Sequence, residues 1–195
     1  MANLLAVLTA LLSWRAFDES NGWKDALVFR PWRVVQYKEY WRFLSHGFVH
    51  ADWTHLLVNM FVLLQFSPAV ESEWGFSHFS AIYLGGMLFA ALPAWLKQKN
   101  NPTYGSLGAS GAVAAVLLAF VFLKPMAQLY LFFLIPLPAW AAGILFFVYE
   151  SRMQRRGGTG IAHDAHLFGG LWGLGYAVST RPELIQGWWR LITGQ

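Results

Sequence analysis

The sequence predicts an all-α, polytopic membrane protein with six transmembrane helices, and three observations lead to this prediction. Hydrophobic residues make up 56% of the chain and charged residues only 12%, whereas soluble domains carry about 25% charged residues. Apolar stretches close to the about 20 residues needed to span a bilayer recur along the chain. The 11 tryptophans suit helices whose ends rest at a lipid–water interface.

The candidate spans follow one another with little between them except near the N-terminus. The first span, Ala2 to Phe17, is short, and the stretch 18–50 after it mixes charged and aromatic residues. This first loop is too polar to span and is expected to lie in the interface. Pro136 and Pro138 are expected to bend the fifth span. The later spans are expected at about 52–72, 79–96, 106–123, 126–149 and 161–180.

Composition narrows the classes of function. The chain has no cysteine, which excludes disulfides, thiolate catalysis and cysteine-ligated metals. The net charge of +4 comes without a long run of Lys and Arg, so nucleic acid is not an expected partner. No internal repeat or change of composition divides the chain. We therefore expect one domain over 1–195, in which 181–195 forms an amphipathic tail at the interface.

Polar groups inside apolar spans are costly, so each is a functional candidate. His55 and Asn59 lie four residues apart in the second span, on one helix face. Ser110 opens the fourth span and His166 lies near the start of the sixth. Small residues beside both let two helix backbones approach closely, so we expect Ser110 and His166 to come within hydrogen-bond reach. These small residues include Gly108, Gly111, Gly169 and Gly173.

A serine–histidine pair has a definite chemical use. A serine hydroxyl is a weak nucleophile until a base removes its proton, and a buried histidine that stays neutral can be that base. Asn and His side chains near Ser110, together with its own backbone N–H, can form an oxyanion hole. The three polar positions together indicate nucleophilic catalysis, although each alone also fits a structural role.

Other interpretations of these residues stay open. GASG fits helix packing, and His55 with Asn59 fits an interhelical hydrogen bond. His46, His50 and His55 have a spacing that suggests a metal, but zinc sites want carboxylate support, and only Asp52 lies close by in sequence. We expect His46 and His50 to make structural hydrogen bonds instead. A small transporter is a further class, although such proteins usually carry internal repeats.

The two polar residues before His166 receive lesser roles. Asp164 lies two residues away and therefore on another helix face, where a capping or interfacial role is expected rather than the third position of a triad. His163 shares the face of His166, so a supporting contact is open. The expected role of His163 is that of a loop histidine at the interface.

Taken in order, these motifs resemble the rhomboid family of intramembrane serine proteases. WRFLSHGFVHADWTHLLVNM resembles the family's Trp-Arg pair followed by H-x(3)-H-x(4)-H-x(3)-N. AVESEWG resembles its glutamate and glycine turn, GASG its GxSG motif, and AHLFGGLWG its AHxxGxxxG motif. The resemblance runs from about Tyr40 to Ala177. Each motif alone is weak, whereas the ordered set is specific.

The resemblance implies a rhomboid-like bundle and a catalytic dyad without an acid, with Ser110 as nucleophile and His166 as base. It also implies that His55 and Asn59 help the Ser110 backbone N–H to hold the oxyanion, beside the glycines of GASG. Residues 139–162 would form the gate for a substrate helix. Structural roles are implied for Trp41, Arg42, His46, His50, Glu71, Gly169 and Gly173.

Two positions depart from the family pattern. The family often places an aromatic ring four residues after the serine, under the base, where this chain has Ala114. Ser67 stands where a glycine is expected, four residues before the glutamate. Because Ala114 has no ring to place under the base, other side chains must orient His166. Phe168 and Trp172 are the candidates.

The expected function is that of a serine endopeptidase that cuts in or near transmembrane helices of other proteins. Substrates are expected to carry helix-destabilising segments. Membrane lipid is an expected partner, no cofactor or metal is expected, and the sequence leaves the oligomeric state open. The alternatives are a catalytically inactive rhomboid-like binder or chaperone and, after that, a small transporter.

The resemblance implies a bacterial inner (plasma) membrane, with the active site toward the extracytoplasmic side. The distribution of charge favours the opposite orientation, because cytoplasmic loops usually carry the excess of Lys and Arg. The family topology would leave only Lys124, Arg181 and Arg190 on the cytoplasmic side. The sequence therefore leaves the orientation open.

Overall fold

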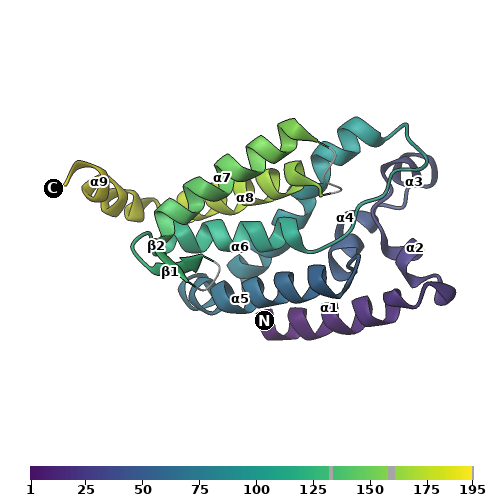
Figure 1. The fold of residues 1–195 in the computed structure, drawn as a ribbon, viewed down its shortest axis with the longest axis horizontal. Helices are drawn as coiled ribbons and strands as arrows, with labels where there is room; N and C mark the ends of the chain where they lie inside the picture. Colours follow the sequence, from purple (N-terminus) through teal and green to yellow (C-terminus); the bar gives the residue numbers. More distant parts are fainter. Residues whose placement is uncertain (132–133, 158–160, 195) are drawn as a thin grey trace.

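The computed structural model describes residues 1–131, 134–157 and 161–194. Long helices lie side by side with roughly aligned axes (Figure 1), so the chain is mostly helical as expected, but a short β hairpin departs from the expected all-α class. Their bounds are α1 (Ala2–Phe17), α5 (Trp53–Gln98), α6 (Ser110–Leu123), α7 (Ala139–Arg156) and α8 (His163–Thr180).

Length and composition single out α5 as a membrane-crossing helix. Among the described residues, it alone is both long and apolar enough to cross a bilayer by these criteria. Helices α1 and α6 are apolar but shorter. The first expected span coincides with α1, and the fourth and sixth begin a few residues before α6 and α8.

Helix α5 joins the second and third expected spans. It covers 46 residues as two helical segments that meet at a kink, where Gly75 adopts φ 74° and ψ 179°, which is not helical. Glycine takes such a positive φ without steric penalty. The break divides α5 into a first arm, 53–74, and a second arm, 76–98. These two arms correspond to the second and third expected spans.

The first half of the fifth expected span is wrong. Strands β1 (Gln128–Leu131) and β2 (Ile135–Pro138) pair antiparallel, with Leu129 opposite Leu137. Proline lacks an N–H and disfavours helical geometry in the residue before it. The two prolines therefore exclude a helix here rather than bend one, and α7 begins only at Ala139.

Helix α6 is the centre of the bundle. Eleven of its 14 residues are buried, and it packs against both α5 and α8. Alanines at several of the buried positions keep the neighbouring backbones close. Figure 1 shows α6 running from the end of the bundle that carries the first loop toward the β1–β2 hairpin.

The first loop folds into short helices at one end of the bundle (Figure 1). Arg42, only 2% exposed, holds them together, because its guanidinium donates to the carbonyls of Asp25 at 3.0 Å and Val28 at 2.6 Å. Trp41 beside it is exposed. The elements are α2 (Trp23–Leu27), α3 (Pro31–Tyr37), α4 (Arg42–Ser45) and 3-10 turns at Glu19–Asn21 and His46–Phe48.

Long-range contacts also tie the opposite end of the bundle. Glu71 accepts a hydrogen bond from the backbone N–H of Ala2 at 3.2 Å, so it joins α1 to the first arm of α5. The tail forms a 3-10 turn at Pro182–Leu184 and α9 (Ile185–Thr193). Trp188 anchors α9 by donating from Nε1 to the carbonyl of Phe122 at 2.9 Å.

A buried carboxylate makes the stability of the first loop depend on pH. Glu39 accepts from Arg33 Nε and from Arg42 Nε at 2.7 and 2.5 Å. The hydrogen bond from Arg33, followed by that from Arg42, lowers the pKa of Glu39 from 4.5 to about 2, against the opposing effect of burial. Its contribution to stability is therefore complete above pH 4.5 and is lost as the pH falls through 2.

Glu39→Gln is expected to lower the melting temperature of the detergent-solubilised protein at neutral pH by about 3–10 °C, since a charge-assisted hydrogen-bond pair is removed. The two melting temperatures should converge as the pH is lowered from 5 toward 2. Calorimetric or fluorescence melts over this range measure the difference. A gap that stays constant with pH would contradict an ionised Glu39.

Candidate active site

Ser110 is the first residue of α6. The backbone just before it passes close to the first arm of α5. Gly108, two residues earlier, has φ 114°, a conformation that L side chains rarely adopt. A Cβ on Gly108 would also lie 2.5 Å from Cε1 of His55. The GASG motif therefore requires glycine at its first position, and this glycine brings the chain against the first arm of α5.

Two histidines hold the backbone that leads into Ser110. The carbonyl of His46 accepts from the N–H of Gly108 at 2.9 Å, and Nε2 of His50 accepts from the N–H of Ala109 at 3.3 Å. The structural hydrogen bond expected for the His50 side chain is thus present, whereas His46 contributes its backbone carbonyl. Both contacts fix the start of α6.

The protonation of His50 follows from its partners. Burial lowers its pKa to about 3, so the ring is neutral and carries one N–H. Because Nε2 accepts, Nδ1 carries the proton and donates to Ser13 Oγ at 3.0 Å. The hydroxyl of Ser13 then donates to the carbonyl of Phe48 at 3.2 Å. Helix α1 therefore supports the backbone next to Ser110.

Ser110 and His166 meet where α6 and α8 come together. Nε2 of His166 lies 2.8 Å from Oγ of Ser110, so the predicted contact is present. The small residues of α8 make it possible, because a Cβ on Gly169 would lie 2.2 Å from the carbonyl oxygen of Gly111. At Gly173 the corresponding distance, to the carbonyl oxygen of Ala115, is 2.0 Å.

The other ring nitrogen of His166 contacts an acid that the sequence analysis missed. Oε1 of Glu150, near the end of α7, lies 3.1 Å from Nδ1 of His166. Its Oε2 lies 2.6 Å from Nδ1 of His163. Glu150 is 5% exposed and His163 is 2% exposed. The expectation of a loop histidine at the interface is therefore wrong, because His163 is buried and begins α8.

Glu150 escaped prediction because of where the fifth span was expected to end. That span was closed at Tyr149, one residue short, before a run that contains three arginines. The available signal was a lone carboxylate at the end of an apolar helix, at the same end of the bundle as His166. Intramembrane ionisable residues are functional candidates by default, and extending the span by one residue would have included Glu150.

Asp164 does not contact the base. Its carboxylate takes a hydrogen bond from Nζ of Lys97 at 3.0 Å and from the N–H of Ala165 at 3.0 Å. Asp164 lies in the first turn of α8, whose N-cap is Ala162, so the capping role is wrong and the interfacial role stays a prediction. Its separation from His166 follows from the two-residue spacing on a helix.

The rings expected to orient His166 have other partners. Trp172 donates from Nε1 to the carbonyl of Ala81 at 3.0 Å, and its ring stacks on Phe89 with a centroid distance of 4.4 Å. Trp172 therefore holds α8 against the second arm of α5. Phe168 is 42% exposed and lines a shallow apolar hollow with Trp172.

Ser110 and His166 form part of the wall of a cavity of about 1040 Å³. The first arm of α5 lines one side and α7 the other, and α7 itself packs against α8 and α6. Ala114, where the family often has a ring, lines the same space. The polar and aromatic lining includes His55, Asn59, Ser110, Phe146, Glu150 and His166.

The predicted oxyanion groups face this cavity. Asn59, 5% exposed, donates one Nδ2 hydrogen to the carbonyl of His55 at 2.8 Å and has a second hydrogen to offer. The backbone N–H of Ser110 belongs to the first turn of α6, where N–H groups lack partners within the helix. His55 contacts His50 edge-on at a centroid distance of 4.8 Å.

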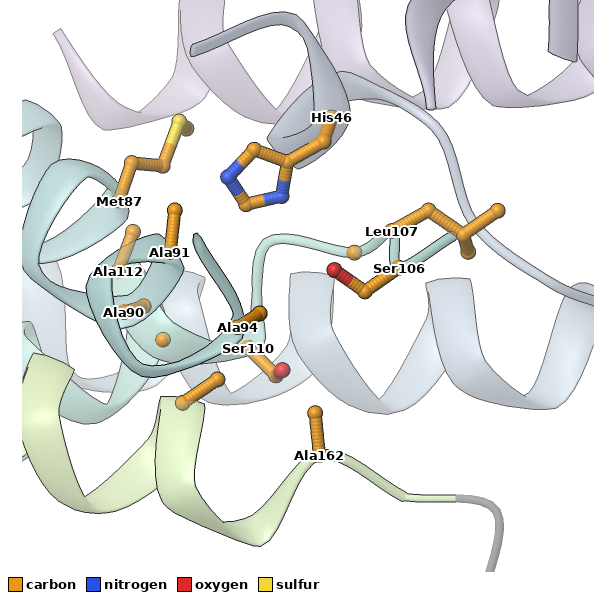
Figure 2. A pocket seen from close by; sticks show the side chains of 13 residues that line it. His46, Met87, Ala90, Ala91, Ala94, Ser106, Leu107, Ser110, Ala112 and Ala162 are labelled. Atoms are coloured by element: carbon orange, nitrogen blue, oxygen red, sulfur yellow. The ribbon is translucent and has the colours of Figure 1, made fainter. Parts of the chain in front are cut away.

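A second, smaller cavity lies on the other side of Ser110. Its volume of about 30 Å³ is enough for one water molecule. Figure 2 shows the side chain of Ser110 directed into the space between Ala94 and Ala162, with His46 above it. The serine therefore borders both cavities.

Glu150, His163 and His166 are also the one group that has the make-up of a metal site among the described residues. Each offers a ligand atom, and these atoms lie within 4.8 Å of one another. The contacts described above already use both carboxylate oxygens and Nδ1 of each histidine. A hydrogen-bonded cluster therefore accounts for the arrangement.

Fold and site together define a helical bundle with a serine–histidine pair built into the contact between two of its helices. Residues 37–183 match the Rhomboid domain family, and the chain belongs to the rhomboid family. Proteins of this family are integral to membranes, which agrees with the apolar composition.

The chain is similar to several curated relatives. It is 31% identical over 185 residues to RHOMBOID-like protein 12, mitochondrial, of Arabidopsis thaliana, covering 85% of this chain and 53% of that protein. It is 32% identical over 146 residues to the human Presenilin-associated rhomboid-like protein, mitochondrial, covering 73% and 38%. YdcA of Bacillus subtilis, named as a candidate rhomboid protease, is 28% identical over 101 residues, covering 52% and 49%. The chain thus spans about half or less of the length of these relatives.

Proposed function

We propose that the chain is an intramembrane serine endopeptidase that cleaves peptide bonds in or near transmembrane helices of other membrane proteins. The observation that carries this proposal is the 2.8 Å separation of Ser110 Oγ and His166 Nε2 at the wall of a large cavity. Family membership and a relative named for protease activity add support.

Acylation follows from the arrangement of the pair. Ser110 Oγ attacks the scissile carbonyl carbon while Nε2 of His166 takes the hydroxyl proton. The charge that develops on the carbonyl oxygen is held by the N–H of Ser110 and by Asn59 and His55. When the C–N bond breaks, His166 gives its proton to the leaving amine, and an acyl-Ser110 ester remains.

Deacylation reverses these roles. A water molecule attacks the ester carbonyl while His166 accepts one of its protons. The C–O bond to Ser110 then breaks, and the proton returns to Oγ. The carboxylic acid leaves and the resting pair is restored, so that no cofactor is consumed in the cycle.

The proposed substrate is a helix that enters between the first arm of α5 and α7. Carbonyls inside a helix are hydrogen-bonded, so attack requires local unwinding, and Gly, Pro or Ser near the cut would favour it. Helix α7 and the following loop, within 139–162, form the proposed gate. Residues 158–160 of that loop lie outside the described residues.

The membrane arrangement that we infer has six crossings within one domain over 1–195. The crossing helices are α1, the two arms of α5, α6, α7 and α8, and α9 lies at the surface. With a rise of about 1.5 Å per residue, the 14 residues of α6 extend about 21 Å, less than the about 30 Å hydrocarbon core. The bundle would therefore sit in locally thinned lipid, or continue through its loops.

The Arabidopsis and human relatives are mitochondrial by name and do not support the sequence-based location in a bacterial inner membrane. We propose a membrane location without specifying the compartment. The family topology and the charge distribution favour opposite orientations of the bundle in the membrane. Topology mapping would distinguish between them.

Labelling of Ser110 by a fluorophosphonate probe tests the proposed activity. The purified wild type in detergent should be labelled, because a serine activated by a base attacks the phosphorus. Ser110→Ala should give no labelling above background. Intact-mass spectrometry of the labelled protein measures the adduct.

Ser179→Ala is the matched control, because this exposed serine lies on α8 far from the pair in sequence and should leave labelling unchanged. Equal labelling of wild type and Ser110→Ala would refute the proposed nucleophile. Absence of labelling in a folded wild type would favour the inactive binder or chaperone.

A further inference from the structure

Glu150 is the strongest feature that the proposed mechanism does not use. It lies on α7, yet both carboxylate oxygens reach histidines of α8: Oε1 is 3.1 Å from His166 Nδ1 and Oε2 is 2.6 Å from His163 Nδ1. The carboxylate is buried. A buried charge is costly unless it is paired and hydrogen-bonded, so the position is unusual for an acid with no role.

The two contacts of His166 fix how its ring is protonated. A carboxylate only accepts hydrogen bonds, so the proton of a neutral His166 lies on Nδ1 and points at Glu150. Nε2 is then unprotonated and directed at the hydroxyl of Ser110, 2.8 Å away. This is the tautomer that a general base needs. The reverse tautomer would face Ser110 with an N–H and leave Oε1 of Glu150 without the donor that His166 provides.

Among the residues that the structure describes, the other candidates for orienting the ring have different partners or are too small. Ala114 stands where the family often places an aromatic side chain, and a methyl group cannot stack under an imidazole. Asp164 is engaged by Lys97, and Trp172 packs against α5. Glu150 is itself held from behind by His163, which is buried at the start of α8.

We propose that Glu150 is a positioning residue for His166, so that the proposed protease works with a Ser110–His166–Glu150 triad in place of an acid-free dyad. The inference rests on the proposed function. Glu150 holds the ring in the reactive tautomer and faces the positive charge that His166 acquires on taking the serine proton. A low-dielectric surrounding strengthens that attraction relative to water. Glu150 itself neither gains nor loses a proton in the cycle.

Because Glu150 is on α7, it also links the proposed gate to the base. Phe146 lies one turn earlier on the same face and lines the same cavity. Movement of α7 away from α8 would withdraw the carboxylate from Nδ1. The base is therefore fully oriented only while the α7–α8 contact holds around Glu150.

The test compares Glu150→Gln with Gln154→Ala. Gln154, one turn further along α7, also ties this helix to α8, since its Oε1 accepts from the N–H of Asp164 at 3.0 Å. It has no contact with the pair among those described. Both variants weaken the α7–α8 connection, but only Glu150→Gln removes the charged acceptor and can offer Nδ1 a donor that favours the wrong tautomer.

Glu150→Gln is expected to slow the second-order rate of fluorophosphonate labelling by about 10²-fold or more, since replacing the carboxylate of a serine-protease triad by its amide lowers kcat by about 10⁴. In cleavage of a model transmembrane substrate, the loss should fall on kcat with KM unchanged. Glu150→Asp should recover part of the labelling rate. Gln154→Ala should label at the wild-type rate.

The possible outcomes separate the two proposals. If the wild type is labelled and a folded Glu150→Gln variant is labelled at the same rate, the positioning role is overturned. The proposed protease function would then still stand. If Gln154→Ala and Glu150→Gln lose the same fraction of the labelling rate, Glu150 acts only by connecting α7 to α8. Loss of wild-type labelling on adding EDTA, restored by zinc, would assign the cluster to a metal instead. If wild type and Ser110→Ala label alike, the proposed function itself fails.

Discussion

His166→Ala is expected to abolish cleavage of a transmembrane substrate. Alanine has no group to take the proton of Ser110, and within 1–131, 134–157 and 161–194 the only basic atom shown within hydrogen-bond distance of Oγ is Nε2 of His166. Loss of the base in serine proteases lowers kcat by about 10⁴–10⁶-fold, so no cleavage should be detected. The measurement is cleavage of a helix containing Gly and Ser, with enzyme and substrate in the same proteoliposomes.

The matched control is His78→Ala. His78 lies on the second arm of α5 and contacts the hydroxyl of Tyr176 at 2.9 Å, outside the proposed site. It should cleave as the wild type does, which separates loss of the base from a general effect of removing a histidine. Substantial cleavage by His166→Ala would mean that another group activates Ser110.

The sequence predicted the contact between Ser110 and His166 because its cause is local. Small residues repeat at fixed spacing along both helices, and close approach of two backbones requires nothing else. The break at Gly75 was predictable for the same reason, since a glycine between two apolar stretches marks a change of direction. Motif order then assigned these local patterns to one family.

Glu150 and the β1–β2 hairpin depend on information that hydropathy does not contain. An apolar stretch with two prolines can be a bent helix or a hairpin followed by a helix, and only the pairing of Leu129 with Leu137 distinguishes them. The hairpin shifts the start of α7 to Ala139, and the helix then continues past Tyr149 to include the acid. One wrong boundary thus concealed the residue that contacts the base.

The role of His50 shows a second limit of the sequence. Spacing placed it beside His46 and His55, which suggested either a metal or a structural hydrogen bond. Its actual partners are Ser13 and the N–H of Ala109, distant from it in the chain by 37 and 59 residues. No periodicity reports contacts of that range. They arise only once α1 packs beside the first loop.

Gly169→Ala is expected to destabilise the protein and separate the catalytic pair at once. The new Cβ would lie 2.2 Å from the carbonyl oxygen of Gly111, the residue that follows Ser110. That atom is backbone, so α6 and α8 must move apart. Overpacking of this kind costs about 1–3 kcal/mol or more, which lowers the melting temperature by about 3–10 °C. Displacement of Ser110 from His166 should reduce the fluorophosphonate labelling rate by about 10²-fold or more, since misplacement by 1 Å has effects of that size.

Gly175→Ala is the control on the same helix, because a Cβ there meets nothing within 4 Å. It removes a flexible residue and should raise stability slightly, by less than about 1 kcal/mol, since alanine favours helix more than glycine does. Labelling of Ser110 should be unchanged. If Gly169→Ala melts and labels as Gly175→Ala does, the close backbone approach is not what holds the pair together. If it melts lower but still labels at the wild-type rate, the contact near Gly111 stabilises the bundle without setting the geometry of Ser110 and His166.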